Sequence, residues 1–319
     1  MHIGASTAMT ASEQSAPSVR RGLRFLRDNQ LPYGEFRTYA SPSIDLRRTY
    51  FDSSIFATAF VLYSIARIDH PYVTVMTNKA ISFLKEEMCC FGLFQYFTSK
   101  NARSIDFDLD CTACASVVLQ QNHLLTTRGY NIRHFMENRN EAGLFYTWVG
   151  DAALANNVDS VVNANVVLYL GDREETKCAC RYLVDTIKSG HESDSYQYYL
   201  DNMTLYYAVS RAYAHGTSSL SGAREAVIEK VLQSSKDDGS FGNELTTACA
   251  VCSLANFGYD GVTRLRNAAS YLEGQQRADG SWQRVAMWVA MFRGFRLYFG
   301  SEELTTALCL EALNHVAAR

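Results

Sequence analysis

Charged, amphipathic segments alternate along this chain with segments that are apolar on almost every side, and the alternation occurs six times. Each charged segment ends in a turn that contains glycine, and most of these turns carry an aromatic residue two positions later. A helix that is apolar all round is buried, whereas a helix with one charged face lies at the surface. The pattern therefore predicts six helix pairs, each with an outer amphipathic helix and an inner apolar helix. The outer helices are expected near residues 18–29, 75–88, 127–138, 173–188, 223–235 and 263–276.

The spacing of the turn glycines indicates a repeated unit. Successive turn glycines are 58, 51, 47, 49 and 41 residues apart, which suits one helix pair and a loop of variable length. An open solenoid would need polar capping repeats, but the last pair is as apolar as the others. The sequence therefore predicts an all-α fold, a single (α/α)6 toroid of six helix pairs over residues 18–319, after a flexible tail at 1–17. The turn glycines are Gly34, Gly92, Gly143, Gly190, Gly239 and Gly280.

An acidic residue stands near the start of every predicted inner helix, so six carboxyl groups are expected at one rim of the toroid. Capping explains such a residue without any chemistry, because a carboxylate accepts hydrogen bonds from the free N–H groups of a helix start. We accept capping for four of the six. These four are Asp52, Asp201, Glu244 and Glu303.

Three acids in alternation lead into the second inner helix: Asp106, Asp108 and Asp110. Alternation places all three on one side of an extended segment, and crowded carboxylates hinder one another's ionisation. A carboxyl group that keeps its proton near neutral pH can act as a general acid. Asp110 is thus either an N-cap or a proton donor, and the triple acid together with the repeats favours the proton donor.

The third inner helix begins with Asp159 and carries Asn163 one turn further on, among valines. A buried amide in such surroundings is costly unless it has hydrogen-bond partners. Asn163 therefore either belongs to a network along its own helix or lines a polar cavity. Both interpretations stay open at this stage.

Composition narrows the classes of function. A net charge of −3 gives no electrostatic case for nucleic-acid binding. The first 17 residues lack an apolar core, so no secretory signal is expected. The nine cysteines of such a chain indicate free thiols in a reducing compartment, and we expect a cytoplasmic protein.

Two cysteine pairs have a spacing that occurs in zinc sites: Cys111 with Cys114, and Cys249 with Cys252. Both pairs lie on predicted inner helices rather than in turns, and no histidine follows at ligand spacing. His315, near the end of the last helix, has no visible partner. Small thiols packed between helices are the favoured interpretation, and no metal site is expected.

Two sets of residues resemble motifs of the squalene–hopene and oxidosqualene cyclases. Residues 276–282, Gln-Arg-Ala-Asp-Gly-Ser-Trp, have the form Q-x-x-x-G-x-W of the repeat motif of that family, and residues 30–36 look like a degenerate copy. Class II terpene cyclases carry D-x-D-D-T-A, and residues 108–113, Asp-Leu-Asp-Cys-Thr-Ala, match it at every position but the fourth. The segment 300–307 is similar to the closing repeat of the family. Through its repeats the resemblance covers nearly the whole chain, although family members usually have two helical barrels.

The resemblance implies a class II-type terpene or meroterpenoid cyclase, formally an isomerase, that needs no cofactor. Asp110 would protonate an alkene or epoxide of a prenyl substrate, Asp108 and Cys111 would orient Asp110, and aromatic ring faces would steer the carbocation. Magnesium would enter only with a diphosphate substrate. The residues expected at the substrate are Asp106, Phe94, Tyr96, Phe145, Tyr146, Trp148, Asp159 and Asn163.

The competing function is a non-catalytic toroid that binds a hydrophobic or prenylated ligand, or a partner protein. Peripheral contact with a membrane is compatible with either function, and the oligomeric state is left open. A zinc-dependent prenyltransferase of the same toroid class is disfavoured, because the last inner helix begins with Thr305, Thr306 and Ala307 and lacks the histidine ligand of that class.

Overall fold

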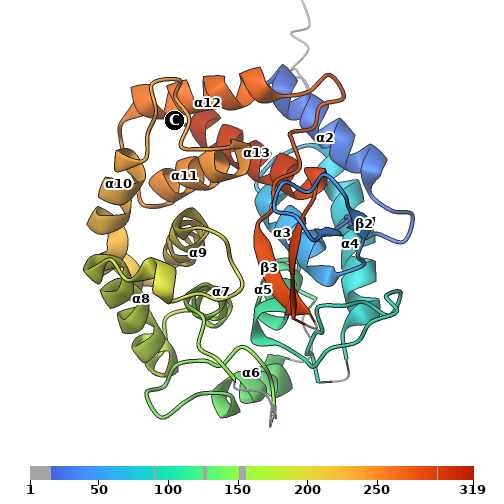
Figure 1. The fold of residues 1–319 in the computed structure, drawn as a ribbon, viewed down its shortest axis with the longest axis vertical. Helices are drawn as coiled ribbons and strands as arrows, with labels where there is room; N and C mark the ends of the chain where they lie inside the picture. Colours follow the sequence, from blue (N-terminus) through green and yellow to red (C-terminus); the bar gives the residue numbers. More distant parts are fainter. Residues whose placement is uncertain (1–15, 90, 125–127, 151–155, 293) are drawn as a thin grey trace, which may run out of the picture.

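The computed structural model describes residues 16–89, 91–124, 128–150, 156–292 and 294–319, and these contain twelve α-helices arranged as a ring (Figure 1). Helices at the perimeter alternate along the chain with helices inside the ring. The outer helices are α2 (Pro17–Asn29), α4 (Pro71–Glu87), α6 (Arg128–Glu137), α8 (Lys177–Ser189), α10 (Arg224–Gln233) and α12 (Val262–Gln275). The inner helices are α3 (Ile55–Ile65), α5 (Leu109–Gln121), α7 (Ser160–Leu170), α9 (Asn202–Ala214), α11 (Glu244–Asn256) and α13 (Glu302–Ala317).

The inner helices form a closed wall, because each packs on the next and α13 packs on α3. Burial follows the charge pattern of the sequence: ten of the 11 residues of α3 are buried, but only three of the 14 of α12. The predicted all-α toroid is therefore confirmed. Along the chain, an outer helix runs back between one inner helix and the next. The inner helices therefore all run in the same direction. The predicted tail lies outside the described residues except for its last two positions, and Pro17 already belongs to α2.

One hydrogen bond recurs where an outer helix leads into its inner partner. The aromatic residue after the turn glycine donates its backbone N–H to a Thr or Asn side chain near the start of the inner helix. The distance is 2.9 Å from Phe36 to Thr58 and 3.1 Å from Trp282 to Thr306. The fourth turn, at Gly190, has no aromatic residue at the equivalent position. The five pairs are Phe36 and Thr58, Phe94 and Thr112, Phe145 and Asn163, Phe241 and Thr247, and Trp282 and Thr306.

The glutamines of the two repeat motifs bind neighbouring outer helices together. Gln276 donates through Nε2 to the carbonyl of Gly280 in its own turn and to that of Ser18 in α2, both at 2.9 Å. Gln30 does the same between its own turn and Met76 of α4, at 2.9 Å. The motif at 276–282 therefore closes the ring, because it joins the last outer helix to the first.

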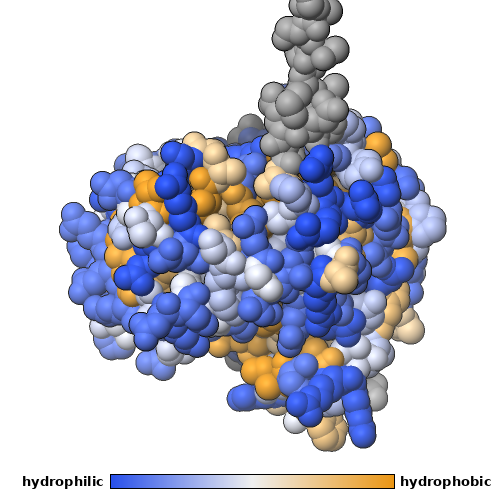
Figure 2. Space-filling view, turned by 90° about the horizontal axis from the view of Figure 1, so that it is seen from above, coloured by the Kyte–Doolittle hydropathy of each residue, from blue (hydrophilic) through white to orange (hydrophobic). Residues whose placement is uncertain are grey.

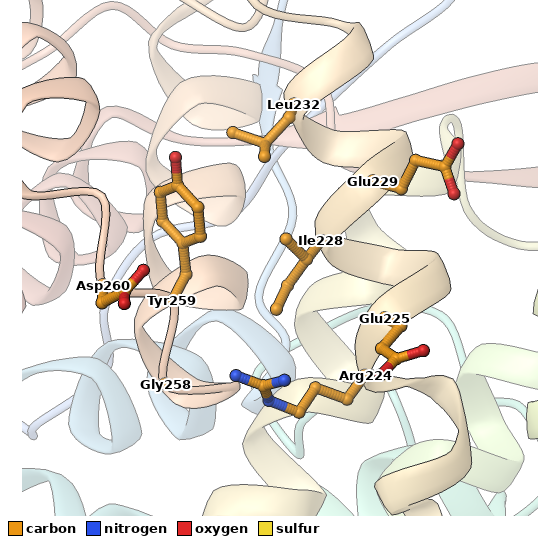
Figure 3. Close-up of a pocket in the computed structure, with 8 residues that line it drawn as sticks. All are labelled: Arg224, Glu225, Ile228, Glu229, Leu232, Gly258, Tyr259 and Asp260. Carbon is orange, nitrogen blue, oxygen red and sulfur yellow. The ribbon is translucent and has the colours of Figure 1, made fainter.

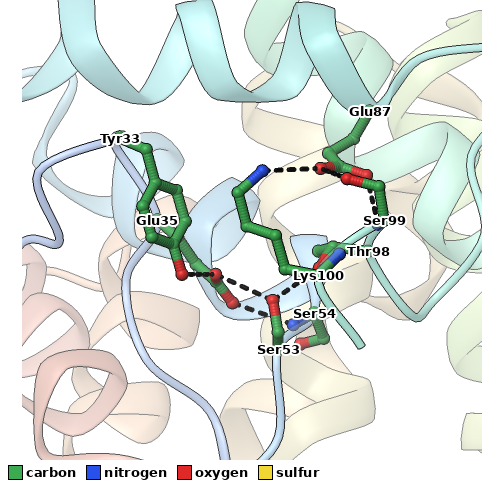
Figure 4. A network of polar contacts seen from close by, with 8 residues as sticks. All are labelled: Tyr33, Glu35, Ser53, Ser54, Glu87, Thr98, Ser99 and Lys100. Carbon is green, nitrogen blue, oxygen red and sulfur yellow. Dashed lines mark hydrogen bonds and ion pairs between the residues drawn. The ribbon is translucent and has the colours of Figure 1, made fainter. Parts of the chain in front are cut away.

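A buried carboxylate fixes the start of α3 (Figure 4). Glu35 is fully buried and accepts hydrogen bonds from the Tyr33 hydroxyl at 2.7 Å, the Ser53 hydroxyl at 2.8 Å and the Ser54 backbone N–H at 2.9 Å. Three donors satisfy a carboxylate that would otherwise be costly to bury. The loop between α2 and α3 is thereby held in one conformation.

A small antiparallel sheet, with the strand order β2-β1-β4-β3, was not expected from the repeat pattern. It joins the loops of the first and last helix pairs, where Tyr39 pairs with Gly300. The stretch 288–299 is rich in aromatic residues around a central Gly294, a local signal for a hairpin. The strands are β1 (Tyr39–Ser41), β2 (Tyr50–Phe51), β3 (Trp288–Phe292) and β4 (Phe295–Gly300).

The surface is mostly hydrophilic, but hydrophobic residues gather on a projection at one edge of the molecule (Figure 2). The most exposed large apolar side chains of the β3–β4 hairpin are Met291 and Phe295, which are 61% and 75% exposed. No helix of the described ranges combines the length and the apolar character that crossing a membrane requires.

Candidate active site

Asp110 is the second residue of α5 and is buried at the end of the helical ring where the inner helices begin. Two side chains from distant parts of the chain hold its carboxyl group. Asn165 of α7 donates through Nδ2 to Oδ1 at 2.6 Å, and the Tyr199 hydroxyl donates to Oδ2 at 2.5 Å. Both oxygens of Asp110 are therefore fixed in position.

Burial dominates the electrostatics of this group. It raises the pKa of Asp110 to about 6, while the hydrogen bonds from Asn165 and Tyr199 act in the opposite direction because they favour the charged form. A carboxyl group with such a pKa is still protonated in about a tenth of the molecules at pH 7, far more often than an ordinary aspartate. This is the property that a general acid needs.

Asp108, not Asp110, is the N-cap of α5. Its Oδ1 accepts the backbone N–H of Cys111 at 2.6 Å. Burial and the nearby charge of Asp110 raise the pKa of Asp108 to about 7, against the effect of the Cys111 N–H and thiol. The sequence analysis expected Asp108 and Cys111 to orient Asp110, but Asp108 binds Cys111, and the side chains that hold the Asp110 carboxyl group are Asn165 and Tyr199.

Asp159 binds two backbone segments at once, the start of α7 and the loop before α9. Its Oδ1 caps α7 by accepting the N–H groups of Val161 and Val162, and its Oδ2 accepts those of Gln197 and Tyr198. Asp159 is fully buried, so these four donors satisfy it within the protein. It therefore holds the loop that carries Tyr199 to Asp110, and it does not itself reach the Asp110 carboxyl group.

Asn163 does not line a polar cavity at Asp110. Its Oδ1 accepts the Phe145 N–H at 3.0 Å, and its Nδ2 donates to the carbonyls of Phe145 and Asp159, both at 2.9 Å. It takes the place that threonine has in the other repeats. Of the two interpretations left open above, the structure supports the local network.

Arg211 of α9 is a member of the site that the sequence analysis missed. The guanidinium is almost completely buried, donates to Asn165 Oδ1, and lies 4.5 Å from the ring centre of Phe60 and 5.1 Å from that of Tyr207. Because arginine can only donate, Asn165 must turn its oxygen to Arg211 and its amide N–H to Asp110. An arginine in an otherwise uncharged inner helix was the available sequence signal.

The predicted aromatic residues separate into core and rim. Phe94 and Phe145 are fully buried in the core. The Tyr96 hydroxyl accepts the Trp288 indole N–H at 3.1 Å, within a cluster of rings that also contains Phe56 and Phe299. The predicted residues thus divide between the core, the rim and the surface. The remaining ones are Tyr146, which is half-buried, Trp148, whose indole N–H binds the Tyr198 hydroxyl at 3.0 Å, and Asp106, which is exposed.

The β3–β4 hairpin reaches across the ring to the loop that carries Tyr199. The N–H of Val289 binds the carbonyl of Tyr198 at 2.8 Å, and Trp288 pairs with Tyr199. Trp288 and Tyr199 are themselves almost fully buried. The hairpin therefore covers the end of the toroid at which Asp110 lies.

A cavity in another part of the described structure is shown in Figure 3. It has a volume of about 470 Å³ and is formed by α10 and the loop after α11. None of the predicted site residues lines it. Its lining residues are Arg224, Glu225, Ile228, Glu229, Leu232, Gly258, Tyr259 and Asp260.

Solved structures share this architecture, although no protein-family model and no curated protein matches the sequence. A variant of the type II terpene cyclase MstE from Scytonema, in complex with geranylgeranyl dihydroxybenzoate, superposes with a TM-score of 0.75 at 17% identity, covering 97% of this chain and 99% of that one. The ent-copalyl diphosphate synthase from Streptomyces platensis gives a TM-score of 0.61 at 16% identity, over 83% of this chain and half of that one. A glycosidase variant gives 0.55 at 13% identity, over 94% and 96% of the two chains. The chain has the fold of the type II terpene cyclases.

Proposed function

We propose that this protein is a class II-type terpene or meroterpenoid cyclase in which Asp110 starts the reaction by donating a proton. The observation that carries the proposal is a buried carboxyl group, with its pKa raised to about 6, beneath the hairpin of a type II terpene cyclase fold. MstE binds a prenylated aromatic substrate, and a substrate of that class is proposed here. The reaction is formally an isomerisation, because the proton gained at the start is returned to solvent when the last cation is quenched by deprotonation.

The hydrogen bonds of Asp110 indicate which oxygen carries the reacting proton. Oδ1 receives the N–H of Asn165, whose orientation Arg211 fixes, so Oδ1 acts as an acceptor. The proton then belongs on Oδ2, where the Tyr199 hydroxyl can rotate and become an acceptor. Asn165, Tyr199 and Arg211 are thus proposed as positioning residues, in place of Asp108 and Cys111.

The substrate is proposed to lie between Asp110 and the hairpin rather than deeper in the ring. The guanidinium of Arg211 lies buried below Asp110 and would repel a carbocation there. Tyr96 and Trp288 belong to a cluster of rings that reaches Tyr199, and ring faces that turn toward the substrate there would attract positive charge. The exposed hairpin side chains Met291 and Phe295 would then face an incoming prenyl chain or the surface of a membrane.

The protonation step requires no cofactor, and magnesium would be needed only if the substrate carried a diphosphate. The test is incubation with prenyl diphosphates, free prenyl chains and prenylated aromatics in deuterated water, followed by chromatography and mass spectrometry. A prenylated aromatic should give a product isomeric with the substrate that carries one solvent deuterium. Binding without conversion of any substrate would instead support a non-catalytic toroid that holds a hydrophobic ligand or a partner.

The activity should depend on pH through the protonated form of Asp110. Because the acid must carry its proton, kcat/KM should be constant below about pH 6 and fall about tenfold per pH unit above it. Tyr199→Phe removes a donor that stabilises the carboxylate, so it should move the falling limb to higher pH. A profile that rises through neutral pH would contradict an acid-initiated reaction.

A further inference from the structure

Cys252, Glu311 and His315 come together at the end of the ring opposite to Asp110. Cys252 lies four residues before the end of α11, and Glu311 and His315 lie one turn apart near the end of α13. The thiol, one carboxylate oxygen and one imidazole nitrogen lie within 4.8 Å of one another. We propose that these three groups bind a zinc ion, with water as the fourth ligand.

The carboxylate is already oriented for this role. Glu311 Oε2 accepts the Tyr207 hydroxyl at 2.7 Å, while Oε1 lies 3.9 Å from His315 Nε2. Zinc bonds of about 2.0 to 2.3 Å in a tetrahedron place neighbouring ligand atoms about 3.3 to 3.8 Å apart. The Glu311–His315 pair therefore has to close by about half an ångström, and the Cys252 thiol, within 4.8 Å of both, by at most about 1.3 Å. Tyr207 supplies the hydrogen bond that carboxylate ligands of metals usually receive.

There is room for a metal-bound water. Glu311 and His315 line a small cavity of about 40 Å³, together with polar residues that include Ser64 and Asn314. A site needs only about one water-sized sphere of space to hold a water molecule. Cys252 is completely buried and is not among the lining residues, so the open position would face the cavity from the side of Glu311 and His315.

The surrounding charges select the type of ion. Arg67, Arg211 and Arg319 are the cationic groups near the cluster, and they disfavour a cation bound by neutral ligands. A thiolate and a carboxylate together neutralise a divalent ion, and the ends of α11 and α13 add negative helix-dipole charge. A thiolate favours zinc over magnesium or calcium.

The protonation states of His315 and Cys252 act in opposite directions on metal binding. Burial and the charges of Arg67 and Arg319 lower the pKa of His315 to about 4, so its imidazole is neutral and available as a ligand at physiological pH. Burial raises the pKa of the Cys252 thiol well above its usual range, which opposes ligation, so zinc has to displace this proton and the site rests on the geometry of the three groups.

Cobalt(II), which reports thiolate ligation by a near-ultraviolet charge-transfer band, is the probe for this site. Chelator-treated protein should take up one Co²⁺ per chain with such a band, and Zn²⁺ should abolish the band by displacement. Cys252→Ser should lose the band. The matched control is Cys249→Ser, one turn earlier on α11 and equally buried, which should keep it.

His315→Gln is a second variant that should fold normally. Because His315 is only partly buried, its replacement should leave the melting temperature of the metal-free protein unchanged. It should bind Co²⁺ at least about 10- to 100-fold more weakly. The proposal would be overturned by an absence of stoichiometric Co²⁺ binding, or by an unchanged band in folded Cys252→Ser or unchanged affinity in His315→Gln. Asp110→Asn should bind Co²⁺ as the unaltered protein does, so this result is independent of the proposed cyclase reaction.

Discussion

Asp110→Asn should lower turnover by about four orders of magnitude while it changes the free energy of unfolding by less than about 1 kcal/mol. An amide has no proton acidic enough to transfer to an alkene. It can nevertheless keep the local geometry, because its oxygen can accept from Asn165 and its N–H can donate to the Tyr199 hydroxyl. Asp108 already caps α5, so the helix start does not depend on Asp110. The measurements are turnover of a prenylated substrate and chemical denaturation of the same preparations.

Asp201→Asn is the matched control for this substitution. Asp201 begins the inner helix α9 and caps it by accepting the Thr204 N–H at 3.0 Å, a role that asparagine fills nearly as well. Its turnover and stability should both stay close to those of the unaltered protein. An active Asp110→Asn protein would refute the proposed acid, whereas equal loss of activity in both variants would point to a general defect.

Gly280→Ala should destabilise the toroid by about 2 to 5 kcal/mol. Gly280 has a φ of +92°, and a Cβ atom there would lie 2.4 Å from the backbone carbonyl oxygen of Arg21 in α2. The backbone of α2 can yield only if the contact between the last and first outer helices opens. That contact also contains the Gln276 hydrogen bonds, so the closure of the ring would weaken as a whole.

Gly258→Ala separates the two causes of this loss. Gly258 also has a positive φ, +70°, but a Cβ atom there meets nothing within 4 Å. Its cost should be limited to backbone strain, about 1 to 2 kcal/mol. Chemical denaturation of both variants gives the comparison. If Gly280→Ala is no more destabilising than Gly258→Ala, the close contact with α2 does not support the ring.

Much of the fold was predictable because amphipathic and apolar segments alternate regularly along the chain. Charged and apolar faces repeat at helical spacing, and this alone assigns the outer and inner helices. The four-stranded sheet escaped the prediction because its signal at 288–299 is short and lies inside a larger helical repeat. Strand pairing between β1 and β4 depends on the two ends of the chain meeting, which only the closed ring brings about.

The candidate acid was accessible from sequence for a similar reason. Asp110 stands in a local pattern of acids before an apolar helix, and such a pattern can be read without knowing the fold. The hydrogen-bond partners of Asp110 could not be identified in this way, because Asn165 and Tyr199 lie 55 and 89 residues further along the chain. Asn163 attracted attention because of its spacing from Asp159, whereas Asn165 faces the acid.

Of the four acids that the sequence analysis accepted as caps, only Asp201 caps its helix, because Ser54, Asn243 and Ser301 hold the N-cap positions of α3, α11 and α13. The sequence by itself determined the six helix pairs, the cap at Asp201 and the position of Asp110 at the start of an inner helix. These features depend on local periodicity and on the chemistry of helix ends. The tertiary structure decided which side chains meet across the ring: Asn165, Tyr199 and Arg211 at Asp110, and Cys252 with Glu311 and His315 at the opposite end. Contacts of this kind depend on the rotation and register of neighbouring inner helices, which packing fixes and which no single segment of the chain encodes.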